Sequence, residues 1–200
     1  MIAAALTGGI ASGKSVVLEV ADSFSRVKTV QADELAKEIY DPDNPCFQEV
    51  LDLFSSRILR DDGSVDLKKV SEKVFSNPAL LEELENISHP YVKGRLEGII
   101  ECLGNDNIEM ALVEIPLLFQ SSSAGSVIFD KVILVEASEE ERLRRLAERD
   151  GMSPKEARKR IKLQSLPENA REKSDYVISA EGTIEETRSE ARSLLKEMLN

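Results

Sequence analysis

A glycine-rich stretch near the start of the chain, Gly8-Gly9-Ile10-Ala11-Ser12-Gly13-Lys14-Ser15, has the spacing G-x-x-x-x-G-K-[ST]. Glycines at these positions allow backbone N–H groups to turn inward around a phosphate, and a following helix points its positive end at the same place. In this pattern Lys14 bridges the β- and γ-phosphates, and the hydroxyl of Ser15 coordinates Mg²⁺. The motif therefore predicts that the chain binds a nucleoside triphosphate together with Mg²⁺.

A candidate general base follows the second predicted strand. Asp33 comes just after the apolar stretch Val27–Val30, at the sheet edge where the ligand-binding loops of an open α/β fold converge. Phosphoryl transfer needs an aligned acceptor, neutralised phosphate charge and a group that takes the hydroxyl proton, and Asp33 suits the last task. An aspartate here also fits the N-cap of a helix that starts near Glu34, so both roles stay open.

Two arginines lie four residues apart on a predicted helix. Arg145 and Arg149 therefore share a helix face and can reach one polyphosphate together. The planar guanidinium donates hydrogen bonds in pairs and stays protonated, which suits phosphate binding. The alternative is that each arginine only pairs with a carboxylate such as Glu141. Arg142 and Arg144 are expected to be solvated neighbours.

Two further polar residues have open interpretations. Glu114 ends a predicted strand, where it could hold a Mg²⁺-bound water or be a hydrogen-bonded polar group of the strand end. His89 is the only histidine and precedes Pro90, so we assign it at most a contact with the substrate. The guanine-specificity pattern N-K-x-D is absent, which favours a small-molecule kinase over a regulatory GTPase.

The elements that must position these residues alternate between strands and helices. Apolar runs predict strands at Ile2–Leu6, Val27–Val30, Ile108–Ile115, Lys131–Val135 and Tyr176–Ser179, with helices over about 13–25 and 183–199. Between about residues 34 and 103 the periodicity is helical, with stops at Pro42, Pro45 and Pro78. This order predicts an α/β fold, a five-stranded parallel core with a helical insertion and a later two-helix segment.

Composition and charge exclude several classes of protein. The 200 residues are 42% hydrophobic and have a formal net charge of −11, which argues against a disordered chain and against a nucleic-acid binder. The segment 142–173, however, holds eleven basic and five acidic residues, which suggests local capture of a small anion. No apolar run is long enough to span a bilayer and no signal peptide is evident, so we expect a cytoplasmic protein without a membrane partner. Cys46 and Cys102 have no metal or disulfide spacing and are expected to be thiols in or near the core.

These motifs, in this order, resemble those of the dephospho-CoA kinase family along nearly the whole chain. The phosphate loop is the most specific of them. The others are Ala32-Asp33, Asp62-Gly63, Val74-Phe75, His89-Pro90, Pro116-Leu117-Leu118-Phe119, Arg145 through Gly151, Arg160-Ile161 with Gln164, and Asp175 through Ile178.

The resemblance implies a three-layer P-loop kinase fold and transfer of the γ-phosphoryl of ATP to the ribose 3′-hydroxyl of dephospho-CoA. It implies a core of about residues 1–33, 104–138 and 174–200, a helical CoA domain of about 34–103, and a helical lid of about 139–173. Asp33, Lys14, Arg145 and Arg149 would be the catalytic residues. The nucleotide would bind at Gly9, Ile10, Ala11, Ser12, Gly13, Lys14, Ser15 and Val16, and the acceptor at Asp33, Lys37, His89, Pro116, Leu117 and Leu118.

Several positions depart from the family pattern. They are Gln31, Lys37, Leu67, Gln120, Ala180 and Glu181. Lys37 keeps the charge of the usual arginine but loses its two-pronged hydrogen bonding. Two alternatives therefore stay open, a P-loop kinase of another small acceptor, such as a nucleoside monophosphate, and a nucleotide-binding switch without transferase activity. The expected assembly is a monomer or weak oligomer.

Overall fold

The structure is a computed structural model and describes residues 1–104, 106–116, 118–119 and 129–200. Its strands are β1 (Ile2–Thr7), β2 (Val27–Gln31), β3 (Met110–Glu114), β4 (Lys131–Glu136) and β5 (Tyr176–Ser179). Its α-helices are α1 (Lys14–Asp22), α2 (Ala32–Lys37), α3 (Phe47–Phe54), α4 (Leu67–Ser76), α5 (Pro78–Gly104), α6 (Glu139–Asp150), α7 (Pro154–Leu163) and α8 (Ile184–Met198). Short 3₁₀ helices, η1 (Glu38–Tyr40) and η2 (Ser56–Ile58), follow α2 and α3.

The five strands form one sheet in the order β2-β3-β1-β4-β5, and every pair is parallel. The predicted α/β fold with a five-stranded parallel sheet is therefore confirmed. In the register, Leu6 of β1 lies opposite Glu114 of β3 and Ile133 of β4. Since all strands run the same way, the loop after β1, the end of β3 and the end of β4 meet at one edge of the sheet.

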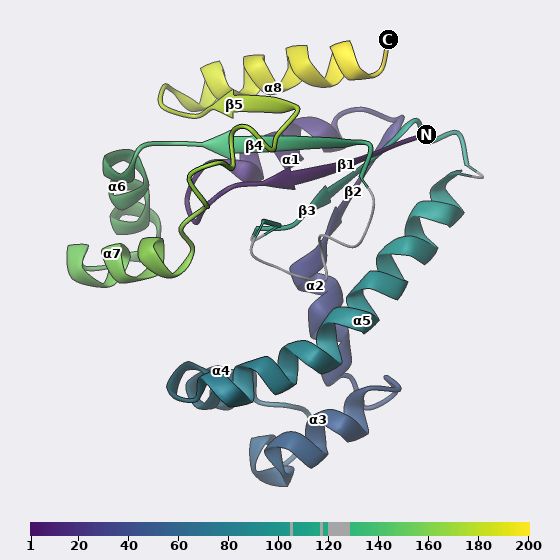
Figure 1. The fold of residues 1–200 in the computed structure, drawn as a ribbon, viewed down its shortest axis with the longest axis vertical. Helices are drawn as coiled ribbons and strands as arrows, with labels where there is room; N and C mark the ends of the chain where they lie inside the picture. The colour runs from purple at the N-terminus through teal and green to yellow at the C-terminus, as the bar shows by residue number, and fades with distance from the viewer. Residues whose placement is uncertain (105, 117, 120–128) are drawn as a thin grey trace. The chain divides into compact units, whose positions relative to one another are not determined.

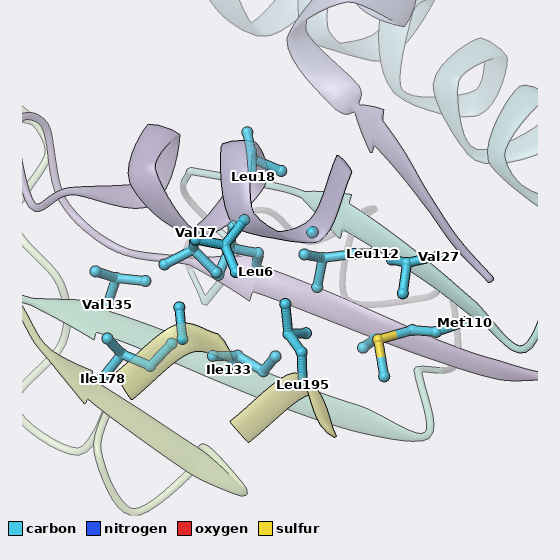
Figure 2. Packing of buried hydrophobic residues seen from close by; sticks show 14 of the residues in the cluster. Leu6, Val17, Leu18, Val27, Met110, Leu112, Ile133, Val135, Ile178 and Leu195 are labelled. Carbon is cyan, nitrogen blue, oxygen red and sulfur yellow. The ribbon is translucent and has the colours of Figure 1, made fainter. Parts of the chain in front are cut away.

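The central strand β1 is built largely from alanine, which does not favour strands by itself. Ala4 and Leu6 alternate toward one face and pack with Val17 of α1 and Leu195 of α8, all of them fully buried (Figure 2). Helices α1 and α8 lie side by side over these residues (Figure 1). Burial between β3 and β4 thus makes this segment a strand, and the small side chains allow close packing.

The chain divides into two compact units. One comprises Met1–Gln31 and Ile99–Asn200 and contains the sheet, and the other comprises Ala32–Gly98. Over its whole length the second unit is helical apart from turns and one isolated bridge, Leu59 to Val65. It has a hydrophobic core of its own, whose fully buried members include Val50 and Ile58.

Helices α6 and α7 form a hairpin in the first unit. Ser153 caps α7 through a reciprocal bond with Glu156, and Gly151 ends α6 with a φ of 63°. Between the helices Leu146, Ala157 and Ile161 are buried, and Ile10 and Ala11 of the glycine-rich loop pack against them. The hairpin and the tip of the loop therefore share one apolar cluster.

Two of the simpler expectations have clear outcomes. None of the described helices is long and apolar enough to cross a membrane. Both cysteines are free thiols, and Cys46 is half-buried. Cys102 was expected in or near the core, but it is exposed near the end of α5.

Candidate active site

The glycine-rich loop joins β1 to α1 and has two positions that require glycine. A side chain at Gly8 would collide with the carbonyl oxygen of Val135, and Gly13 has a φ of 108° just before the first residue of α1. Ala11 also takes a left-handed conformation, with a φ of 59°. The backbone N–H of Ser12 donates to the carbonyl of Gly9 at 3.2 Å, which closes a turn within the loop. These features fit the predicted phosphate loop.

Lys14 lies within the loop and is largely buried. Its Nζ donates to the carbonyl oxygens of Gly8 at 2.9 Å and Gly9 at 3.2 Å. The carboxylate of Glu114 lies 3.7 Å away, and both side chains are less than one-fifth exposed. Glu114 thus lies beside Lys14 at the end of β3, and its carboxylate offsets the charge of the buried ammonium group.

The residues of the loop fit a bound nucleotide with Mg²⁺. Ser15 is exposed on the first turn of α1, where its hydroxyl is accessible. The buried Oγ of Ser12 has no hydrogen-bond partner within the described parts of the chain, so a polar atom of the loop is open to a ligand. The described residues contain no cluster of three or more His, Cys, Asp or Glu side chains that could hold a metal. Mg²⁺ suits such a site, since it binds through few protein ligands together with substrate phosphates and water.

Arg145 bridges two loops at the sheet edge. Its guanidinium donates to the carbonyl oxygens of Ala11 at 3.2 Å and of Ala180 at 2.5 Å, and its Nε donates to Glu141 at 2.9 Å. Arg149, one turn further along α6, is exposed and paired with Asp150 at 2.7 Å. Arg145 therefore combines carboxylate pairing with contact to the phosphate loop, whereas Arg149 pairs with the carboxylate of the adjacent Asp150.

The prediction that Arg142 is solvated is wrong, although it holds for Arg144. Arg142 is half-buried and its Nε donates to the carbonyl of Ile10 at 2.8 Å, and burial lowers the pKa of its guanidinium. Arg144 is exposed and pairs with Glu141 and Glu148. Arg142 and Arg145 are three residues apart, so they share a face of α6, and this spacing was the signal in the sequence that could have placed Arg142 at the loop.

The segment after β3 is described in part. The hydroxyl of Thr7, the last residue of β1, donates to the carbonyl of Pro116 at 3.3 Å, which ties this segment to the base of the phosphate loop. Leu118 is buried. The predicted acceptor residue Leu117 and the departure at Gln120 lie outside the described residues.

Three predicted residues of the acceptor site lie in the second unit. Asp33 is the second residue of α2 and is exposed, so it stands within the helix and is not its N-cap. A carboxylate in the first turn still interacts favourably with the helix dipole. Lys37 is exposed and paired with Glu34 at 2.6 Å, and His89 is half-buried within α5. The predicted site residues are therefore divided, with the phosphate loop and both arginines in the first unit.

Comparison with known proteins decides the family. A model of the dephospho-CoA kinase family matches residues 2–186. The chain belongs to the dephospho-CoA kinase family. The dephospho-CoA kinase of Carboxydothermus hydrogenoformans is 37% identical over 191 residues, which cover 96% of this chain and 91% of the relative. The solved structure of the dephospho-CoA kinase from Campylobacter jejuni is 29% identical in sequence, and the match covers 98% of this chain and 96% of that chain with a TM-score of 0.72.

More distant structures share the fold of this kinase. The shikimate kinase of Acinetobacter baumannii is 13% identical, covers 100% of this chain and 93% of its own, and gives a TM-score of 0.53. At that identity the likeness concerns the fold alone.

Proposed function

We propose that this kinase transfers the γ-phosphoryl group of ATP to the ribose 3′-hydroxyl of dephospho-CoA, giving coenzyme A and ADP, in the last step of coenzyme A synthesis. The family match over residues 2–186 is the observation that carries the proposal. The conformation of the phosphate loop supports it, because the loop presents Lys14 and the start of α1 together. Family membership does not favour the two alternatives, a different acceptor or a switch without transferase activity.

The loop and the arginines supply binding and charge neutralisation. Lys14 reaches the β- and γ-phosphates once its ammonium leaves the carbonyls of Gly8 and Gly9. Arg145 and Arg149 act on the polyphosphate from α6. Ser15 would hold Mg²⁺, which would offset part of the charge of the phosphates. Glu114 balances the charge of Lys14 and is suited to hold a water of the metal.

Asp33 is the proposed general base. The 3′-hydroxyl must lose its proton as it attacks the γ-phosphorus, and an exposed carboxylate in the first turn of α2 can accept it. Lys37, His89 and Pro116 to Leu118 would contact the acceptor. The helical unit Ala32–Gly98 would then be the CoA domain, and the α6–α7 hairpin with the segment up to residue 173 would be the lid.

A coupled assay for ADP formation tests the reaction. ADP should appear only when both ATP and dephospho-CoA are present, with Mg²⁺, and coenzyme A should accumulate in equal amount. Nucleoside monophosphates and other small alcohols serve as competing acceptors in matched reactions. ADP formation with one of these and none with dephospho-CoA would overturn the proposed acceptor.

Asp33→Asn tests the general base. The amide keeps the size of the side chain but cannot accept the proton, so kcat should fall by about 10²–10⁴ while the affinity for ATP changes little. Glu72→Gln is the control, since it removes an exposed carboxylate from α4 of the same unit. Near-normal turnover of Asp33→Asn would contradict the assignment.

A further inference from the structure

The guanidinium of Arg142 lies directly against the phosphate loop. Its Nε donates to the carbonyl oxygen of Ile10 at 2.8 Å. A Cβ placed on Gly9 would be 2.5 Å from Nη2 and 2.8 Å from Cζ of the same guanidinium, so the side chain covers the glycine. Nη2 is buried and has no hydrogen-bond partner among the residues that the structure describes. The partly buried guanidinium of Arg142 therefore interacts with the phosphate loop, although the family resemblance implied no role for this residue.

The hydrogen bond to Ile10 determines the direction of a backbone donor. The peptide bond between Ile10 and Ala11 is planar, and in a trans peptide the N–H points opposite to the carbonyl oxygen. With the carbonyl of Ile10 held by Arg142, the N–H of Ala11 points away from Arg142. Backbone N–H groups arranged in this way along a loop are what binds phosphate.

The next peptide of the loop is held from the same helix. Arg145 donates to the carbonyl oxygen of Ala11. Ala11 has a φ of 59°, a conformation that is costly for a residue with a Cβ and that persists only where its surroundings impose it. The side chains of Ile10 and Ala11 also pack against the cluster around Leu146. Two arginines and an apolar contact from the α6–α7 hairpin thus define the conformation of the loop tip.

We propose that Arg142 is a positioning residue for the nucleotide, which orients the Ile10–Ala11 peptide so that the N–H of Ala11 faces the phosphates. The residue acts through the backbone and does not itself touch the reacting atoms. The phosphates lie on the loop both before and during transfer, so Arg142 stabilises the ground state and the transition state equally. Loss of Arg142 should therefore raise the KM for ATP and leave kcat unchanged. The inference rests on the proposed function only in that a nucleotide binds at this loop.

Titration of the protein with ADP tests the inference without an acceptor. Arg142→Met keeps the length of the side chain but removes the donor, and the Kd for ADP should rise about tenfold, as expected for the loss of one charge-assisted hydrogen bond. The KM for ATP should rise by a similar factor, while kcat stays within about twofold. Arg144→Met is the matched control, since it removes the same charge from an exposed position of the same helix. An unchanged Kd in Arg142→Met, or an equal loss in Arg144→Met, would overturn the proposal.

A double-mutant cycle provides a second measurement. Gly9→Ala forces the guanidinium of Arg142 to move, so it should raise the Kd for ADP in the otherwise native protein. In the Arg142→Met background the same substitution should raise the Kd little further. If Gly9→Ala raised the Kd for ADP by the same factor in both backgrounds, the coupling between Gly9 and Arg142 would be refuted. ADP binding without phosphorylation of dephospho-CoA would refute the proposed acceptor and leave this inference intact, whereas a native protein that does not bind ADP would refute both.

Discussion

Arg145 and Arg149 occupy successive turns of α6 but differ in what they contribute to stability. In Arg145→Ala the carbonyl oxygens of Ala11 and Ala180 lose their donor, and Ala180 is only 1% exposed. Glu141 retains a partner, because Arg144 also donates to it at 2.6 Å. In Arg149→Ala the loss is one exposed pair with Asp150. The two substitutions remove the same side chain from the same helix, so each controls for the other.

The expected magnitudes differ clearly. Hydrogen bonds from a charged donor contribute about 1.5–3 kcal/mol each, and a carbonyl left buried without a donor costs a comparable amount. Only Ala180 is fully buried, so Arg145→Ala should lower the free energy of unfolding by about 2–3 kcal/mol. For a chain of this length that corresponds to a fall in Tm of about 4–12 °C. The exposed pair of Arg149 should contribute little to stability, because solvent screens its charges.

Thermal unfolding followed by circular dichroism, with urea titration as a second measure, separates the two cases. Arg145→Ala should melt well below the native protein, and Arg149→Ala within about 3 °C of it. The reasoning is refuted if the two variants melt together, since the carbonyl contacts of Arg145 would then add nothing. Arg145→Lys, which can keep one of the two carbonyl bonds, should fall between the native protein and Arg145→Ala.

Three further predictions concern the loop, the lid and the core. Lys14→Met should lower kcat/KM for ATP by about 10²–10³, because it removes the positive charge that acts on the phosphates; a variant with native kcat/KM would contradict this. The hydrogen bond from Arg144 holds the pKa of Glu141 at about 2, against an ordinary value of 4.5, so its stabilisation is present above about pH 4.5 and is lost as the pH falls toward 2. Glu141→Gln should accordingly destabilise at pH 7 and much less at pH 3, measured by urea unfolding, and an equal difference at both pH values would count against it. Leu112→Ala, at a fully buried position of β3, should cost about 2–5 kcal/mol in the same assay, and a cost below 1 kcal/mol would show that the site collapses around the gap.

The parallel core was predictable from the sequence because its strands are near-continuous apolar runs. Tyr176–Ser179 was predicted with the bounds that β5 has, and Thr183 caps α8 where the sequence predicted a helix start. Boundaries between a strand and a helix were harder. Asp33 was assigned as a possible N-cap, but α2 begins at Ala32 immediately after β2, two residues earlier than predicted, because burial of Ala32 and Leu35 in the second unit stabilises the earlier start.

Side-chain partners across the sheet edge could not be predicted in the same way. The spacing places Arg142 on the helix face of Arg145, but that this face contacts the loop while Arg144 stays exposed depends on tertiary structure. Glu181, one of the departures from the family pattern, accepts a hydrogen bond from the backbone N–H of Ser138 and so links the ends of β5 and β4. Both contacts join segments far apart in sequence, and the hydrophobic periodicity of the sequence does not predict such contacts.

The position of β1 in the sheet has a consequence for synthesis on the ribosome. The strand lies between β3 and β4, both of which come much later in the chain, so its backbone groups can pair on one side only after Glu114 has emerged and on the other only after Glu136. Until Glu114 has emerged, Ile2–Thr7 is an apolar segment with two unpaired edges, the kind that associates with other chains or with chaperones. The contacts of Arg142 and Arg145 with the glycine-rich loop form later still, because α6 follows β4 in the chain.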